Sequence, residues 1–383
     1  MNNSTATVNE ESFIKRSDGD KNISKEYRIL LEKKIGRLFS EALKVSLTRP
    51  AFGLFLLRFI RKQNLLANKR FVGDEPGKSI PPFMIISITK QCNLKCSGCY
   101  SRVNHESLGR EMSTEKLVSL ITQAQALGTS IALLAGGEPF SRKDILGITE
   151  KFPAMLFPVF TNGMLIDDEI ILRLRRQKNV IPILSLEGDS LQTDRRRGKH
   201  VFSTVSKTLE KLKKNKIFCG ISFTATAENL DTITDEDYIK EKAVLGAKVF
   251  FYNEYVPFES GTENLCLHKE QRIILEDRLK TLRRKNPALF ISFPGDEEEF
   301  DGCLSAGRGF FHVNPSGDVE PCPFAPYSVS SLEDVSLKEA LDHPFLQTIR
   351  ANHNNLHEEH GGCALWNNKK WIEKLQVKHT VEV

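Results

Sequence analysis

The amino-acid sequence predicts an α/β protein built around a partial (β/α)6 barrel of the TIM type. From Pro82 onward, short apolar segments typical of strands alternate with helical segments, and six such units can be counted. This alternation favours parallel βαβ units. The length of 383 residues leaves room for a helical extension before the barrel and a smaller α+β domain after it.

The segments that precede the barrel differ in character. Residues 1–23 lack an apolar stretch and are expected to form a flexible polar tail. Residues 24–81 are expected to form a helical extension and linker, with helices over 24–47 and 50–70. The apolar part of the second helix is interrupted by Arg58 and is too short for a transmembrane span.

The N-terminal helices carry most of the basic excess of a chain whose formal net charge is +5. The preferred interpretation is that they pack on the barrel and leave a solvated basic face. The alternative is contact with a membrane surface, an acidic electron donor or a substrate.

The barrel is expected to occupy residues 82–295. Its six strands are predicted near 83–89, 131–135, 155–161, 181–186, 217–224 and 247–253. The helices between them are predicted near 114–127, 142–151, 166–177, 202–214 and 233–244. Because functional sites of parallel barrels gather at the carboxyl ends of the strands, the residues that follow each strand are the candidates for chemistry.

Three cysteines follow the first predicted strand. Cys92, Cys96 and Cys99 stand in the run CNLKCSGCY, and three thiolates this close together indicate one metal centre. Thiolates select iron–sulfur clusters and zinc over hard cations. Structural zinc takes four protein ligands, whereas a cubane cluster with three cysteines keeps one iron open for another ligand. The open position indicates catalysis.

Other candidate residues follow the next three strands. Gly136-Gly137-Glu138-Pro139 come after the second strand, where the glycines allow a close backbone approach and exposed carbonyls accept from an ammonium group. Asn162 follows the third strand within a Thr-Asn-Gly turn. Ser185 lies at the end of the fourth strand, and Arg197 follows it with a guanidinium suited to a carboxylate.

Together these motifs resemble the radical S-adenosylmethionine (SAM) superfamily. The resemblance rests on the cysteine spacing, the GGEP and TNG motifs, Ser185 and Arg197. It implies a 4Fe–4S cluster on Cys92, Cys96 and Cys99, with SAM contacted by Gly136, Gly137, Glu138, Pro139, Asn162, Ser185 and Arg197. One position differs, because Gly98 stands where the family commonly has an aromatic residue, and Tyr100 follows the third cysteine.

A second set of cysteines lies beyond the barrel, in residues 296–383. Cys303 and Cys322 flank a predicted hairpin with a turn at 315–318, and Cys363 follows later. This arrangement resembles the twitch and SPASM auxiliary-cluster domains and implies a second 4Fe–4S cluster on these three cysteines. The fourth position is left to His360, to Cys266 or to an open iron that binds substrate.

The resemblance implies reductive cleavage of SAM to a 5′-deoxyadenosyl radical, which removes hydrogen from a substrate. A peptide or protein substrate, as for a maturase, is preferred, and oxidation or rearrangement of a small-molecule intermediate is the alternative. A non-enzymatic iron–sulfur or zinc scaffold is the alternative from another class. Reduced flavodoxin or ferredoxin is the expected electron donor.

The composition and the cysteines favour a cytoplasmic, oxygen-sensitive protein. Hydrophobic residues make up 40% and charged residues 27% of the chain, as in ordinary globular proteins. The sequence shows no secretory signal, so the eight cysteines are expected to be reduced thiols and cluster ligands. A nucleic-acid partner is not expected, because the net charge of the barrel and C-terminal residues is slightly negative.

Overall fold

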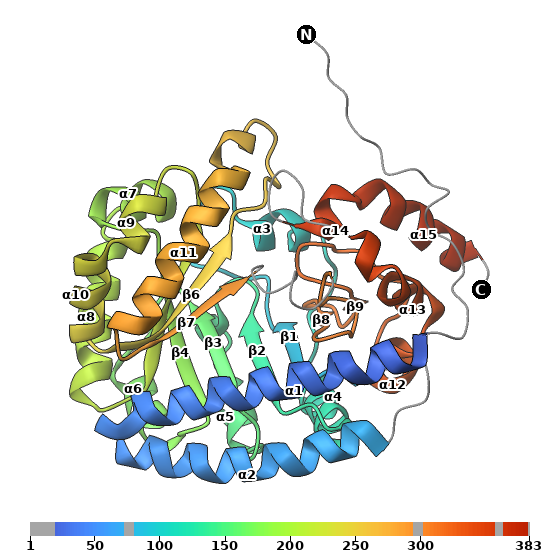
Figure 1. Ribbon diagram of the computed structural model, residues 1–383, viewed down its shortest axis with the longest axis horizontal. Helices are drawn as coiled ribbons and strands as arrows, with labels where there is room; N and C mark the ends of the chain where they lie inside the picture. The colour runs from blue at the N-terminus through green and yellow to red at the C-terminus, as the bar shows by residue number, and fades with distance from the viewer. Residues whose placement is uncertain (1–19, 73–79, 294–301, 357–362, 382–383) are drawn as a thin grey trace.

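The computed structural model describes residues 20–72, 80–293, 302–356 and 363–381 (Figure 1). Its strands form one sheet in the order β7-β6-β5-β4-β3-β2-β1-β8-β9. The strands are β1 (Phe83–Ser87), β2 (Ile131–Ala135), β3 (Phe157–Thr161), β4 (Val180–Leu186), β5 (Cys219–Ala225), β6 (Ala247–Glu254), β7 (Leu289–Phe293), β8 (His312–Val313) and β9 (Val319–Glu320). The pairs from β1 to β7 are parallel, as is the pair β1–β8.

Helices connect and cover these strands. Before β1 lie α1 (Asp20–Val45) and α2 (Pro50–Val72). Within the barrel lie α3 (Tyr100–His105), α4 (Thr114–Leu127), α5 (Ile145–Glu150), α6 (Asp168–Arg176), α7 (Ser190–Arg197), α8 (Val201–Lys214), α9 (Leu230–Thr234), α10 (Glu236–Val244) and α11 (Lys269–Lys285). The C-terminal part contains α12 (Leu337–Leu341), α13 (Pro344–Ala351), α14 (Ala364–Asn367) and α15 (Lys369–Val381). None of the helices in the described ranges is both long and apolar enough to cross a membrane.

The predicted α/β fold with parallel units is confirmed, and a further strand extends it. The six predicted strands correspond to β1 to β6, whereas β7, which pairs with β6, was not predicted. Local signals fix several boundaries. The helix α4, for example, begins after Ser113, whose side chain accepts from the Lys116 amide, and ends at Gly128, whose φ of 106° suits glycine.

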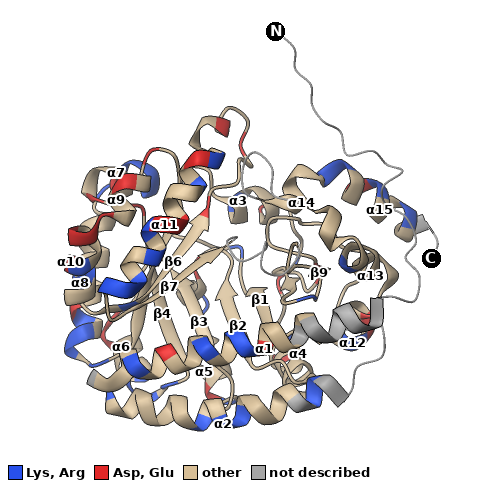
Figure 2. Cartoon of the chain, in the orientation of Figure 1, with Lys and Arg blue, Asp and Glu red and all other residues tan. Residues whose placement is uncertain are grey.

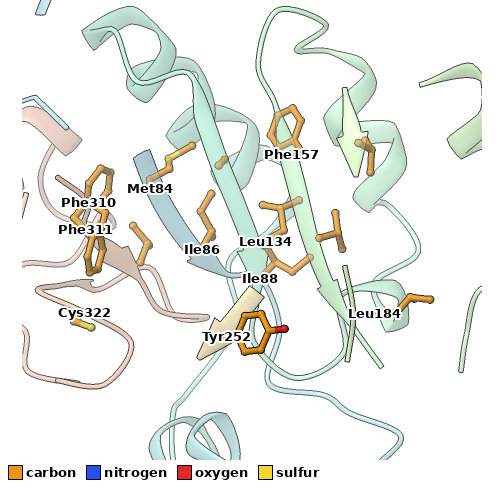
Figure 3. Close-up of a cluster of buried hydrophobic side chains, with 14 of the residues drawn as sticks. Met84, Ile86, Ile88, Leu134, Phe157, Leu184, Tyr252, Phe310, Phe311 and Cys322 are labelled. Atoms are coloured by element: carbon orange, nitrogen blue, oxygen red, sulfur yellow. The ribbon is translucent and has the colours of Figure 1, made fainter. Parts of the chain in front are cut away.

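Two apolar clusters lie on opposite faces of the strands. On β4, Leu184 and Leu186 belong to the cluster shared with the surrounding helices, whereas Ile181 and Ile183 belong to the cluster shared with α1 and α2. Figure 3 shows part of the first cluster, around Ile86, Leu134 and Phe157. This alternation follows from the two-residue period of a strand, and it explains why the strands are apolar on both faces.

The N-terminal helices close the amino ends of the strands. Phe52 of α2 stacks on Phe218, which precedes β5, with ring centroids 4.1 Å apart. Arg49, between the two helices, donates to the carbonyl oxygens of Ile217 and Gly246, both just before strands. The preferred interpretation, that these helices pack on the barrel, agrees with the structure, and Figure 1 shows them beneath the sheet.

The C-terminal hairpin continues the barrel sheet. β8 pairs in parallel with β1, in the register Ile85 to His312, and antiparallel with β9. The predicted turn is present, with Gly317 at a φ of 95° and the Asn314 amide donating to the Asp318 carbonyl at 3.1 Å. The expected boundary between residues 295 and 296 lies outside the described residues. The hairpin itself is tied directly to the first strand of the barrel.

Candidate functional site

The first cysteine set lies in the loop between β1 and α3, at the carboxyl end of the parallel strands. Cys92 is exposed, whereas Cys96 and Cys99 are half-buried. Burial raises the pKa of Cys96, and the guanidinium groups of Arg197 and Arg196 oppose that rise. Because a thiolate is the form that ligates iron, these arginines favour the ligating state of Cys96.

The turn of residues 136–139 packs directly on the cysteine loop. The amide of Gly137 donates to the Thr89 carbonyl at 2.7 Å, and the amide of Glu138 donates to the Gln91 carbonyl at 2.8 Å. A Cβ atom at Gly137 would lie 2.6 Å from the Gln91 carbonyl carbon and closer still to its oxygen. The absence of a side chain at Gly137 therefore allows this turn to lie directly against the backbone of the cysteine loop.

The Glu138 side chain joins the ends of β2 and β3. It is 1% exposed and accepts from the Phe140 amide at 3.0 Å, the Thr161 hydroxyl at 2.7 Å and the Asn162 amide at 2.7 Å. Burial raises its pKa, and these three donors partly offset that rise. Glu138 therefore acts within the protein as a buried cross-link.

The Asn162 side chain reaches the cysteine loop. Its Nδ2 donates to Asn93 Oδ1 at 2.8 Å and lies 3.8 Å from Cys92 Sγ. The structure thus brings the motifs that follow β1, β2 and β3 into one hydrogen-bonded unit, as expected for residues at the same edge of a parallel sheet.

Arg196 and Arg197, at the end of α7, both reach one buried carboxylate. Glu187 is 2% exposed, and its Oε1 accepts from Arg196 Nη1 and from Arg197 Nε, each at 2.6 Å. Arg196 Nη1 also donates to the Thr224 hydroxyl at 2.8 Å. Ser185 is half-buried two residues earlier, opposite Ser222 of β5. Glu187 was missed as a functional residue, although the cluster of three arginines after it was a signal that a buried anion was required.

The second half of the cysteine loop is held by α7 and by the segment after β6. The amide of Ser97 donates to the Arg196 carbonyl at 3.0 Å, and that of Gly98 donates to Glu259 Oε2 at 3.1 Å. Gly98 has a φ of 64°, and a Cβ atom there would lie 2.8 Å from Cε2 of Tyr255. The tyrosine ring therefore occupies the space beside position 98, which explains why that position has no side chain.

The second cysteine set is also brought together. Cys322 and Cys363 are buried and Cys303 is half-buried. Burial raises the pKa of Cys322 well above its ordinary value, and the neighbouring Cys363 and Cys303 raise it further. Within the described ranges, no group of three or more His, Cys, Asp or Glu side chains could hold a single metal ion.

Two residues were predicted as candidates for the fourth ligand of the auxiliary cluster. His360 lies outside the described residues. Burial raises the pKa of Cys266, and the nearby charged groups are Arg272, Glu263 and Glu254. Cys266 lies between β6 and α11 in the chain, and its role as an auxiliary ligand stays a prediction.

Aromatic side chains connect the two cysteine sets. Tyr100 follows Cys99 directly and packs edge-on against Phe324, with centroids 5.3 Å apart. The Phe324 amide in turn donates to Cys322 Sγ at 3.5 Å. The segments that carry the two cysteine sets therefore pack against each other through these aromatic side chains.

A buried polar network lies beside this aromatic contact. His312 of β8 is bonded through Nε2 to the Ser87 hydroxyl at 2.8 Å and through Nδ1 to Glu320 at 2.7 Å. The ring of His105 stacks against that of His312, and burial lowers the pKa of His105 to about 3. The network ties α3, which follows the first cysteine set, to the hairpin that leads to Cys322.

The parallel barrel carries three free thiols in the loop at its carboxyl end, an arrangement that suits an iron–sulfur site. The family model of the radical SAM superfamily matches residues 86–240. These residues therefore form a radical SAM domain, a kind of enzyme domain that uses a 4Fe–4S cluster and SAM. The scaffold alternative is therefore set aside.

The chain is similar to curated proteins with different substrates. It is 30% identical to the Fe-coproporphyrin III synthase of Methanosarcina barkeri (strain Fusaro / DSM 804) over 220 residues, which cover 55% of each chain. It is 27% identical to the AdoMet-dependent heme synthase of the same organism, over 68% of this chain and 81% of the relative. It is 26% identical to the antilisterial bacteriocin subtilosin biosynthesis protein AlbA of Bacillus subtilis (strain 168), over 70% of this chain and 61% of that protein.

A solved structure supports the fold. The crystal structure of Streptococcus suis SuiB bound to precursor peptide SuiA superposes with a TM-score of 0.60 at 17% identity, covering 79% of this chain and 74% of SuiB. The partial TIM-type barrel expected from the sequence is thus confirmed. The match to the coproporphyrin enzyme spans about half of that relative, so the substrate of this chain has to be argued from its own site.

Proposed function

We propose that this protein is a radical SAM enzyme that modifies a peptide or protein. The observation that carries the proposal is the contact between the two cysteine segments. Tyr100, which follows Cys99, packs against Phe324, whose amide donates to Cys322. The similarity to AlbA and the fold shared with peptide-bound SuiB support a peptide substrate. The bound cluster and SAM supply the electron and the radical that remove hydrogen from an unactivated C–H bond.

In this proposal, Cys92, Cys96 and Cys99 hold the SAM cluster. Their number suits a cubane that keeps one position open, and the nearby arginines favour the thiolate of Cys96. The cysteine loop is braced on both sides, by the turn at 136–139 and by the segment that contains Glu259. Such bracing fixes the three thiols before the cluster binds.

The strand-end residues are proposed to orient SAM. Gly136, Gly137, Glu138 and Pro139 form the turn whose backbone carbonyls are suited to the ammonium group, and Asn162 lies beside Cys92. Ser185 and Arg197 are proposed to contact the carboxylate or ribose. The Arg197 guanidinium contacts Glu187 through Nε and Nη2, and its Nη1 has no hydrogen-bond partner among the described residues.

A second cluster is proposed on Cys303, Cys322 and Cys363. The burial of Cys322 and Cys363, and the influence of Cys363 and Cys303 on the pKa of Cys322, support a cluster shielded from water. The fourth position is assigned either to His360 or to an open iron that binds substrate. Reduced flavodoxin or ferredoxin is the proposed electron donor, and the reducing cytoplasm is the proposed location.

Modification of a small molecule is the second candidate function. Its support is specific, because two relatives bear the names Fe-coproporphyrin III synthase and AdoMet-dependent heme synthase, and the second is matched over 81% of its length. A substrate comparison separates the two candidates. The full-length enzyme, reduced with dithionite, would be given SAM with precursor peptides encoded beside its gene, or with Fe-coproporphyrin III, and 5′-deoxyadenosine would be measured.

The clusters are tested by anaerobic reconstitution. We expect about eight irons per chain in the wild type and about four after Cys303→Ala and Cys322→Ala together, with 5′-deoxyadenosine still formed but no product. A chain with Cys92→Ala should not cleave SAM. Cys266→Ala is the matched control and should keep the full iron content. Full turnover of the Cys92→Ala chain, or bound zinc in place of iron, would contradict the assignment.

A further inference from the structure

The helix α2 has an unusual outward face. Its inward face is buried, with Phe52, Leu56 and Phe59 between 1% and 4% exposed. On the opposite side, Leu54 is 52% exposed and Leu65 is 70% exposed. A surface helix that packs on one side normally presents polar residues on the other, so exposed leucines on the outward face require a reason.

The exposed leucines and the cations of α2 share this outward face. At 3.6 residues per turn, the side chains that point away from the barrel fall within an arc of about 100°. They include Leu54, Leu57, Arg58, Arg61 and Leu65, all of which are exposed. Leucine and arginine thus share one stripe, with Lys62 at its edge.

The charge of α2 has one sign only. The helix contains Arg58, Arg61, Lys62, Lys69 and Arg70 but no Asp or Glu. The surface helix α11 provides a contrast, because its cations alternate with acids and Lys280 pairs with Glu276 at 2.8 Å. Figure 2 shows the blue residues of α2 without red neighbours on that helix. A helix face that contacts only water has no electrostatic reason to lack acidic residues, whereas contact with an anionic partner favours their absence.

We propose that the outward face of α2 binds an anionic lipid bilayer surface. Apolar side chains interleaved with arginine and lysine on one face are the pattern of helices that lie in the membrane interface. The leucines enter the boundary between headgroups and acyl chains, and the guanidinium groups remain at the lipid phosphates. With 23 residues, the helix offers a contact line about 35 Å long.

This surface lies opposite the cysteine loop. The inward face of α2 contacts residues at the amino ends of strands, since Phe52 stacks on Phe218 and Gln63 accepts from the Ser130 hydroxyl, whereas the cysteines follow the carboxyl end of β1. Figure 1 shows α2 and α3 at opposite ends of β1. A bilayer on α2 therefore leaves the mouth of the barrel facing the aqueous phase, where SAM, a reductant and the substrate arrive without obstruction.

The test is sedimentation of the full-length protein with vesicles of phosphatidylcholine, alone or mixed with phosphatidylglycerol. We expect binding to the anionic vesicles only, and release as salt is raised. The variant Arg58→Gln, Arg61→Gln, Lys62→Gln should bind roughly 100-fold more weakly, because each cation near an anionic surface strengthens binding by about a factor of five. The variant Leu54→Ser, Leu57→Ser, Leu65→Ser should also lose binding.

The matched control removes the same charge elsewhere. Lys207→Gln, Lys213→Gln, Lys214→Gln alters exposed lysines of α8 and should bind anionic vesicles like the wild type. Equal binding by the α2 variants, or no binding by the wild type, would overturn the proposal. A change of oligomeric state in the leucine variant, with vesicle binding unaltered, would assign the face to a second copy instead. The readout does not depend on enzyme activity, so it stands apart from the proposed reaction.

Discussion

Replacing Gly137 with alanine adds one methyl group between the GGEP turn and the cysteine loop. The new Cβ would lie 2.6 Å from the Gln91 carbonyl carbon. This carbon belongs to the backbone, so it cannot rotate away as a flexible side chain could. The two segments must separate, which breaks or lengthens the bonds from the amides of Gly137 and Glu138. The two bonds contribute about 1 kcal/mol each, and overpacking costs about 1–3 kcal/mol more, so we expect a loss of about 3–5 kcal/mol.

Urea unfolding of the metal-free chain measures this loss, and iron content after reconstitution measures its effect on the loop. Gly109→Ala is the matched control, because a Cβ atom at Gly109 meets nothing within 4 Å. It should be neutral or stabilise by about 0.5 kcal/mol, since alanine restricts the unfolded chain. If Gly137→Ala unfolds at the same urea concentration as Gly109→Ala and binds the same amount of iron, the steric reasoning is wrong.

Three further predictions concern buried groups. Glu187→Gln removes the carboxylate shared by two arginines and should lower the free energy of unfolding in urea by about 3 kcal/mol. The control Glu228→Gln, whose partner Arg195 is exposed, should lower it by less than about 1 kcal/mol. Equal losses would contradict the role of burial. The pKa of His105 is about 3 in the folded chain and ordinary in the unfolded chain, so its contribution to stability is full above about pH 6.5 and falls by about 1.4 kcal/mol per pH unit below it. The variant His105→Phe should flatten the dependence of unfolding free energy on pH between about pH 7 and 5. An unchanged slope would exclude His105 as its source. Iodoacetamide should label the exposed Cys92 of the native metal-free chain before the buried Cys219, because burial blocks access to Cys219 and raises its pKa to about 11. Equal labelling rates, measured by mass spectrometry, would contradict this order.

Local patterns predicted most of the barrel. The strands β1 to β6 follow from apolar segments with turn residues at their ends, and these signals lie within a few residues of each strand. The strand β7 was missed because its five residues form a short apolar run that becomes a strand by pairing with β6. Such pairing is a tertiary property, which a local pattern does not contain.

The chemistry that this protein can carry is set by the order of its residues. Cysteine spacing is a property of the chain, so Cys92, Cys96 and Cys99 indicate an iron–sulfur site whatever the fold around them, and the glycines of the GGEP motif indicate a close backbone approach. Which groups meet depends instead on the tertiary fold. The packed barrel places Tyr255 beside Gly98 and Phe324 against Tyr100, because those contacts join segments far apart in the chain whose distances depend on how the whole protein packs.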